Sequence, residues 1–151
     1  MYHTIIKRIT RNAFEDLSDR NADPLLDRCA PDMTHTFAGE HALGGTRHSR
    51  EAFRTWLDRL YRLFPELQFH IRDILVAGPP WNTRLAISWR DRGVAADGVD
   101  YENEGIHRLR LEWGRLVELH AKLDTQHLNR TLDRMAADGI DEAAADPITS
   151  F

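Results

Sequence analysis

Two polar residues, Asn103 and His107, interrupt an otherwise apolar strand face near the C-terminus. They lie in residues 101–124, YENEGIHRLRLEWGRLVELHAKLD, whose alternation of apolar and charged residues predicts a long β-hairpin. Imidazole titrates near neutral pH, so His107 is suited to general acid–base catalysis if this face covers a cavity. Asn103 would then orient a ligand carbonyl or hold the imidazole tautomer. The alternative is that both residues are structural and are satisfied by neighbours in the core.

A second histidine, His35, shares a predicted strand face with Met33 and Phe37. If that face also lines the cavity, His35 and His107 together could remove a proton from an enolisable substrate and return it elsewhere. This is the chemistry of an isomerase or a cyclase. The sequence does not show whether the two histidines are close in space.

Aromatic residues supply candidate walls for a ligand site. Trp56, Phe69 and Trp89 occupy periodic apolar positions of one predicted helix and two predicted strands. Phe37 and Tyr101 lie on the strands that carry His35 and Asn103. All five could stack on a ligand, although ordinary core packing explains such positions equally well.

The glycine-rich segment 38–48, AGEHALGGTRH, is expected to form a loop at the mouth of the pocket. It contains His41, Arg47 and His48. An arginine there could receive an anionic substrate, whereas the simpler interpretation is a solvated charge on a loop.

No metal or cofactor site is expected. His120, Asp124 and His127 are of metal-ligating types, but a strand-to-helix junction breaks their spacing and His120 faces outward in the expected register. The chain has no nucleophile motif, phosphate-binding loop or dinucleotide fingerprint.

The expected hairpin register is the one that places apolar residues together on one face and charged residues together on the other. A two-residue turn at Trp113-Gly114 would place the apolar Leu109 opposite Glu118, so a three-residue loop over 112–114 is favoured. That register pairs Leu109 with Val117, His107 with Leu119, Gly105 with Ala121, Asn103 with Leu123, Arg108 with Glu118 and Glu104 with Lys122. Glu104 becomes a surface ion pair and not a catalytic acid, and the Gly105–Ala121 pair leaves a hollow in the apolar face.

Hydrophobic periodicity and turn residues predict the other elements. They are a helix over 3–19, a short helix from Asp23-Pro24 that stops at Pro31, a strand over 32–37, a helix from the N-cap Ser49 to Phe64, strands over 67–76 and 83–90, a loop over 91–100, a closing helix through Leu128, Leu132 and Met135, and an extended tail from Gly139. A change of apolar parity indicates a bulge near Arg72-Asp73. Consecutive strands without intervening helices predict an α+β fold with a curved antiparallel sheet covered on one face by helices.

Length and composition indicate one ordinary globular domain. The chain has 151 residues, of which 42% are hydrophobic and 29% charged, and we expect residues 1–138 to form the domain and 139–151 an extended tail. The net charge of −4, with arginines interspersed among acids, argues against a nucleic-acid partner. No apolar stretch is long enough to span a membrane, and a lone Cys29 with no signal-peptide core favours the cytoplasm.

This layout resembles the SnoaL-like polyketide cyclase group of the nuclear transport factor 2-like superfamily over about residues 3–135. The most specific segments are 32–53, DMTHTFAGEHALGGTRHSREAF, and the hairpin end 113–124, WGRLVELHAKLD. The resemblance implies a curved antiparallel sheet wrapped around a helix-covered cavity, in a cystatin-like cone, and a homodimer.

Known active sites of the superfamily transfer poorly. The general base of ketosteroid isomerase maps near Thr36, its protonated aspartate maps to His107, and its tyrosine falls at 12–14, where no tyrosine stands. The catalytic aspartate of SnoaL-type cyclases maps to Ala121, which argues against the same cyclisation mechanism. Asp124 fits the family pattern and is expected to cap the closing helix.

The leading hypothesis is a protein with a hydrophobic pocket that binds or transforms a small apolar molecule. As an enzyme it would be a cofactor-free isomerase, cyclase or lyase, with His107 as acid or base, Asn103 as orienting donor and His35 as second proton carrier. The rivals are a non-catalytic ligand-binding or dimeric interaction module, and a subunit that requires a partner protein.

Overall fold

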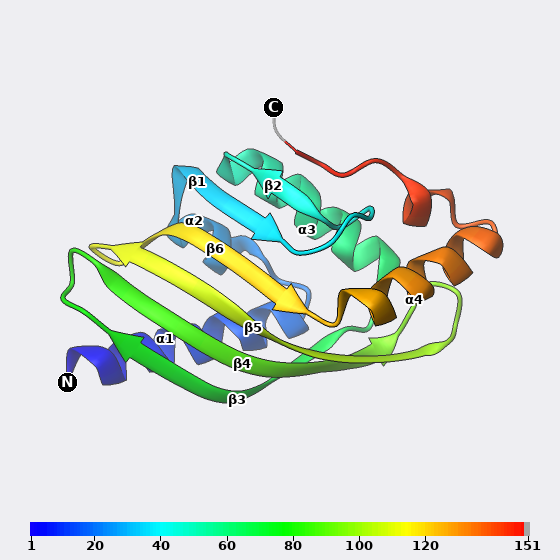
Figure 1. Ribbon diagram of the computed structural model, residues 1–151. Helices are drawn as coiled ribbons and strands as arrows, with labels where there is room; N and C mark the ends of the chain where they lie inside the picture. The colour runs from blue at the N-terminus through cyan, green and yellow to red at the C-terminus, as the bar shows by residue number, and fades with distance from the viewer. Residues whose placement is uncertain (150–151) are drawn as a thin grey trace.

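The computed structural model, which describes residues 1–149, has six strands in one curved sheet and four α-helices (Figure 1). The helices are α1 (Tyr2–Ser18), α2 (Asp23–Arg28), α3 (Arg50–Leu63) and α4 (Thr125–Ala137), followed by the short 3-10 helix η1 (Asp141–Ala144). The strands are β1 (Cys29–Phe37), β2 (Gly45–Arg47), β3 (Gln68–Ala77), β4 (Thr83–Val94), β5 (Asp100–Glu112) and β6 (Arg115–Leu123). Their order across the sheet is β2-β1-β6-β5-β4-β3, and the sheet does not close into a barrel.

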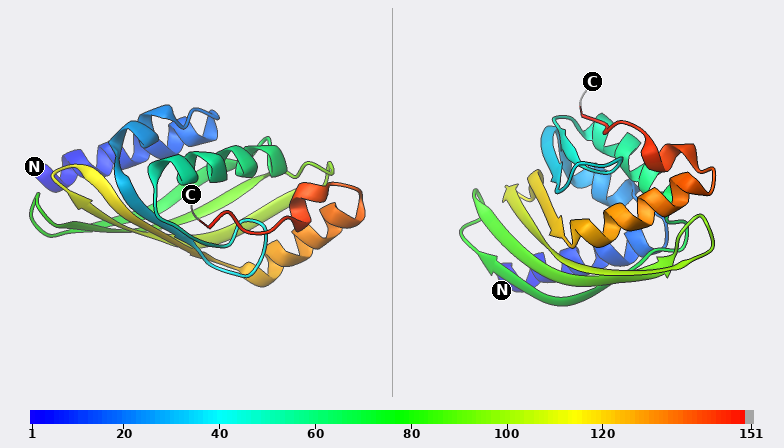
Figure 2. Two further views of the ribbon diagram at one scale, coloured as in Figure 1. Left: turned by 90° about the horizontal axis from the view of Figure 1, so that it is seen from above. Right: turned by 45° about the vertical axis from the view of Figure 1, so that its right-hand side comes forward.

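Helices α1, α2 and α3 cover the concave face of the sheet, whereas its other face is left open (Figure 2). Each helix turns an apolar stripe to the sheet, for example Phe53, Trp56, Leu57 and Leu60 on α3. The hydrophobic core lies between these stripes and the inward-facing strand residues. This arrangement is the expected α+β fold.

The sheet is mixed and not fully antiparallel, because β1 pairs with β6 in parallel. The expectation of antiparallel strands rested on the consecutive strands β3 to β6, which do pair that way. Strands joined by a short turn must be antiparallel. No short turn connects β1 to β6, so these two strands are free to pair in parallel.

The expected hairpin register is wrong. Trp113 and Gly114 form a two-residue turn with φ angles of 52° and 79°, and Glu112 pairs directly with Arg115. A β-bulge next to Leu111 then adds one residue to β6. Beyond the bulge, the side chains of β6 point to the opposite faces of the sheet from those that the short turn alone would give. The two-residue turn is therefore compatible with one apolar and one charged face.

The bulge changes the partners that were expected across the hairpin. Leu109 faces Leu119, His107 faces Ala121 and Gly105 faces Leu123. The space above Gly105 is therefore not a hollow beside Ala121. A Cβ on Gly105 would lie 2.9 Å from Trp89 Cζ2, so the Trp89 ring occupies that space.

The charged face also pairs differently. Glu104 forms ion pairs with Arg72 at 3.4 Å and Arg90 at 3.6 Å, on the neighbouring strands, instead of pairing with Lys122. Glu118 pairs with Arg110 at 3.4 Å and not with Arg108, which faces His120. Glu104 is nevertheless a surface residue, as expected.

Several boundaries differ from the expected ones. Strand β4 continues to Val94 through the region that was expected to be a loop, and the glycine-rich segment contains β2. Helix α2 ends at Arg28, and β1 already begins at Cys29. The tail includes η1 and is not fully extended, although its last two residues, 150 and 151, lie outside the described part of the chain.

Other local predictions are confirmed. The register shift in β3 falls between Ile71 and Asp73. Ser49 accepts a hydrogen bond from the Ala52 backbone N–H and caps α3. Asp124 accepts one from the His127 backbone N–H and caps α4.

The helices within residues 1–149 include none that combines the length and apolar character that a membrane crossing requires.

Gly105→Ala is expected to lower the free energy of unfolding by about 1–3 kcal/mol through overpacking. The added Cβ would lie 2.3 Å from the Lys122 carbonyl oxygen, which belongs to the backbone and cannot rotate away. Urea unfolding measures the change. Gly98→Ala is the control, because Gly98 has open space and a φ of 84°, so only backbone strain of about 1 kcal/mol is expected there. Wild-type stability of Gly105→Ala would contradict this close approach.

Candidate functional site

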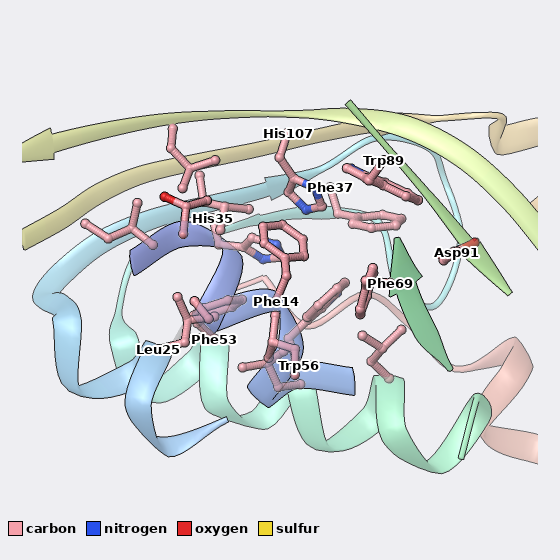
Figure 3. A pocket seen from close by; sticks show the side chains of 18 of the residues that line it. Phe14, Leu25, His35, Phe37, Phe53, Trp56, Phe69, Trp89, Asp91 and His107 are labelled. Atoms are coloured by element: carbon pink, nitrogen blue, oxygen red, sulfur yellow. The ribbon is translucent and has the colours of Figure 1, made fainter. Parts of the chain in front are cut away.

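A cavity of about 130 Å³ lies between the concave face of the sheet and helices α1 to α3 (Figure 3). Its wall is almost entirely apolar, with aromatic rings from both layers. An engineered apolar cavity of roughly 150 Å³ in another protein binds benzene. The volume therefore suits a ligand built on a single ring.

Several residues that line this cavity carry an unpaired polar atom. Within residues 1–149, four buried side-chain polar atoms have no hydrogen-bond partner, and they are Asn82 Oδ1, Trp89 Nε1, Asp91 Oδ1 and His107 Nδ1. Three of these four belong to residues that line the cavity. Leaving a buried polar group unpaired costs about 1–3 kcal/mol, so these atoms indicate a site whose partner is a ligand or water.

His107 projects from β5 into the cavity, as Figure 3 shows. Its ring lies between Phe14 and Trp89, at centroid distances of 5.6 and 5.3 Å. Neither ring nitrogen has a hydrogen-bond partner among the described residues. Burial lowers the pKa of His107 to about 4. The imidazole is therefore neutral at physiological pH and offers one N–H donor and one acceptor.

Asp91 is a site residue that the sequence-based reasoning missed. It lines the cavity from β4, is 4% exposed, and lies opposite Phe69 and Asn103 on the neighbouring strands. Burial raises the pKa of its carboxyl from 3.8 to about 7, and nearby backbone N–H groups offset this only in part. A carboxyl with this pKa can both take up and release a proton near neutral pH.

The signal for Asp91 was present in the sequence. Thr83, Leu85, Ile87 and Trp89 alternate along β4, and Asp91 continues the same parity. The strand was predicted to end before Asp91, because the glycines at 93 and 98 suggested a loop. Extending the alternation by one step would have placed a carboxyl on the cavity face.

His35 lines the cavity from β1 and is 1% exposed. Its ring packs against Phe53 and Trp56, each with a centroid distance of 4.5 Å. Arg47 lies directly opposite on β2, and its Nη1 donates to His35 Nδ1. Burial, then the charge of Arg47, then the histidines at 107 and 120 hold the pKa of His35 well below its usual range.

Asn103 is buried but does not line the cavity. Its Nδ2 donates to the Tyr101 hydroxyl at 2.8 Å and to the Asp124 carbonyl at 3.1 Å, and its Oδ1 accepts from the backbone N–H groups of Glu104 and Asp124. These bonds use its hydrogen-bonding capacity and join β5 to the start of α4. The structure thus favours the structural alternative for Asn103.

The remaining sequence candidates divide into two groups. Phe37, Trp56, Phe69, Trp89 and Tyr101 all line the cavity. His41, Arg47 and His48 do not. His41 instead braces its own loop, donating from Nε2 to the Ala38 carbonyl and accepting at Nδ1 from the Leu43 N–H.

The residues considered for a metal have other roles. Asp124 caps α4, and the His127 ring stacks on Tyr101 at 5.3 Å with an interplanar angle of 5°. No group of three or more His, Cys, Asp or Glu side chains that could hold a metal occurs within the described chain.

Comparison with protein families and with solved structures places the chain among known folds. The model of the SnoaL-like domain matches residues 10–119, so the chain belongs to the SnoaL-like domain family. Comparison with curated proteins finds no significant match.

Solved structures share the fold at low sequence identity. A nuclear transport factor 2-like protein of unknown function from Burkholderia pseudomallei is 22% identical, with a TM-score of 0.74 over 83% of this chain and 95% of that one. TerC, co-crystallised with polyporic acid, is 15% identical, with a TM-score of 0.72 over 83% and 96%. A putative SnoaL-like polyketide cyclase from Jannaschia sp. is 14% identical, with a TM-score of 0.65 over 91% of each chain.

The raised pKa of Asp91 predicts a specific dependence of stability on pH. Between 3.8 and about 7, the folded state holds a proton that the unfolded state has released. The free energy of unfolding therefore falls as pH rises through this window, and Asp91→Asn removes this loss. Relative to Asp91→Asn, the wild type should lose stability between about pH 5 and about pH 8, by at most an amount on the order of 3 kcal/mol.

Urea unfolding at both pH values measures this difference. Asp133→Asn is the matched control, since Asp133 is exposed on α4 and should leave the pH profile unchanged. Parallel profiles for wild type and Asp91→Asn would contradict the burial effect at Asp91.

Proposed function

We propose that this protein binds a small apolar ring compound in the cavity and catalyses proton transfer on it without a cofactor. The proposal is carried by one observation: Trp89, Asp91 and His107, each with an unpaired polar atom, line a mostly apolar cavity. A ligand with a ring and one or two oxygen atoms would pair these groups and fill the space between them. Membership of the SnoaL-like family and the likeness to a putative polyketide cyclase support the same class of ligand.

Asp91 is the general base in this proposal. Its ionised carboxylate removes a proton from a carbon next to a ligand carbonyl, so a C–H bond breaks and an O–H bond forms on Asp91. The electron pair moves into a C=C bond, and the negative charge develops on the carbonyl oxygen. The protonated Asp91 then returns the proton, to the same carbon or to another one.

His107 stabilises the charge that develops on oxygen. A neutral imidazole N–H donates a hydrogen bond to the ligand oxygen without transferring its proton. This hydrogen bond is stronger in a site that excludes water. This assignment differs from the initial hypothesis, in which His107 itself was the acid or base. A pKa of about 4 makes His107 a weak base, whereas that of Asp91, about 7, is matched to neutral pH.

The enolate formed in this step is common to isomerisation, aldol-type cyclisation and β-elimination. The geometry does not favour one of the three, so the proposal covers an isomerase, a cyclase or a lyase. A non-catalytic ligand-binding module is the second candidate, and it needs the cavity but not the ionisation of Asp91.

Assembly and location form part of the same proposal. The outer face of the sheet carries the half-exposed Ile106 and is not covered by any described helix, which supports a homodimer formed through this face. The lone, buried Cys29 is compatible with a reducing cytoplasm. Sedimentation of the purified protein would measure the dimer.

Proton transfer can be tested with cyclohexenone, a single-ring enolisable ketone, in deuterated buffer. The wild type should accelerate exchange of the protons next to the carbonyl, as read by proton NMR. Asp91→Asn should reduce the rate by about 10²–10⁴-fold and retain binding, because it keeps the shape but not the base. His107→Phe should also slow exchange, since it preserves ring volume and removes the N–H donor.

Asp133→Asn is the control and should exchange at the wild-type rate. Binding of cyclohexenone to the wild type without accelerated exchange would favour the binding module. Absence of binding by this ketone and by other single-ring compounds would contradict the proposed function itself.

A further inference from the structure

Among residues 1–149, Arg47 is a buried cation for which no carboxylate serves as partner. It is fully buried, and within residues 1–149 it forms no ion pair with a carboxylate. Its Nε donates to the Ile148 carbonyl and its Nη2 to the Gly44 carbonyl, each at 2.8 Å, and its guanidinium lies 5.6 Å from the Trp56 ring. Burial, with the nearby charge of Arg59, lowers the pKa of Arg47 to about 10, so it remains charged at neutral pH. Burying a charge this way is costly unless something compensates it.

The same guanidinium fixes the tautomer of His35. An arginine has donors and no acceptor, so His35 Nδ1 must be the acceptor of the bond from Arg47 Nη1. The proton of the neutral imidazole is therefore on Nε2. No hydrogen-bond partner of Nε2 exists among the described residues, and the His35 ring lines the cavity. His35 thus presents an unpaired Nε2–H at the cavity wall. This N–H is polarised by the Arg47 guanidinium, which is hydrogen-bonded to the other ring nitrogen.

The charges around the cavity are arranged with opposite signs. The Arg47–His35 pair lies on the β2-β1 side of the sheet, whereas Asp91 is on β4, three strands from β1 in the order β1-β6-β5-β4. His107 lies on β5 between them, and it is close enough to His35 that a proton on one ring would disfavour a proton on the other. Figure 3 shows His35 and His107 on the same side of the Trp89 ring, with Asp91 on the other. A ligand in the cavity would therefore meet a positive potential at one end and a carboxyl at the other.

We propose that Arg47 and His35 form an oxyanion subsite, which makes the cavity selective for ring compounds that carry an anionic oxygen, namely enolates and phenolates. This inference rests on the proposed function, because it concerns the ligand of the same cavity. It adds the charge state of that ligand and a direction, with the oxygen toward His35 and His107 and the exchangeable carbon toward Asp91. Arg47 acts through His35 and is a positioning residue.

The subsite can be tested with a difluorophenol whose fluorines are both ortho to the hydroxyl. The ring is close in size to benzene, and its fluorine NMR shift differs between phenol and phenolate. The wild type should prefer the phenolate, which lowers the pKa of the bound ligand. The ligand should therefore ionise in the complex at a proton concentration at least tenfold higher, and so at a lower pH, than the free ligand. The corresponding difluorobenzene, which lacks the oxygen, should bind at least tenfold more weakly.

Two variants remove the subsite in different ways. His35→Phe keeps an aromatic ring and removes the N–H, and Arg47→Met removes the cation behind it. Both should abolish the shift in ligand ionisation and weaken phenolate binding tenfold or more, while binding of the difluorobenzene stays within about twofold. His35→Gln, which restores an N–H donor, should recover part of the phenolate preference. Arg84→Met is the control, because it removes an exposed cation on the outer face of the sheet, and it should behave as wild type.

The outcomes separate the subsite from the proposed function. Binding of neutral phenol by the wild type, or an undiminished shift in His35→Phe, would overturn the subsite and assign Arg47 a purely structural role in holding residues 44 and 148. Those results would leave a functional cavity in place. If neither compound binds, the cavity is not a ligand site and both proposals fail. Should Arg47→Met not fold, the His35→Phe and His35→Gln pair alone decides.

Discussion

The parity of the strands that face the cavity is the constraint on which the rest of the structure depends. Because side chains alternate along a strand, a one-residue error anywhere would exchange the apolar and charged faces of β6. The tight turn at Trp113-Gly114 taken alone produces that error, and the bulge next to Leu111 corrects it. The correction places His107 beside Ala121, in a row that continues to Ile87 on β4 and Phe37 on β1.

The mostly apolar residues of this row explain why few polar groups reach the cavity and why those that do are strongly affected by burial. Trp89 fills the space above Gly105, so the wall near the middle of β5 is closed, and the imidazole of His107 lies beside the indole ring. In such a setting burial shifts the pKa of an acid and of a base in opposite directions. It raises that of Asp91 and lowers that of His107, so at neutral pH the carboxyl is only partly ionised and the imidazole is neutral. Desolvation of these groups costs folding stability. It also gives the Asp91 carboxyl a pKa suited to proton exchange and keeps the His107 imidazole neutral, as a hydrogen-bond donor.

Arg47 is the exception, because it keeps its charge inside the protein. Backbone carbonyls from Gly44 and Ile148 hold it, and the second of these joins the C-terminal segment to β2. Arg59 adds a parallel tie, donating to the Ala42 and Asp146 carbonyls. The tail that was expected to be extended is therefore fastened over the edge of the sheet by buried or half-buried arginines. Its placement and the polarisation of His35 depend on the same side chain.

The position of the carboxyl differs from the one that the resemblance to SnoaL-type cyclases implies. Ala121 occupies the place at which the resemblance implies a cyclase aspartate, and it is fully buried next to His107. Asp91 offers a carboxyl from β4 instead. A cavity can receive an acid from any inward position of the surrounding strands, so family motifs that follow one strand do not locate it.

The sequence by itself determined the four α-helices, the five longer strands apart from their ends, the caps at Ser49 and Asp124, the bulge in β3 and the inward faces of β1 and β5. These features follow from local periodicity and hydrogen bonding. It also placed His35 and His107 on apolar faces. Only the tertiary structure decided that β1 runs parallel to β6, that β4 extends to Asp91, and that Arg47 lies opposite His35. The physical reason is that a pairing between distant strands depends on how the whole sheet curves around the helices, and no short segment contains that information.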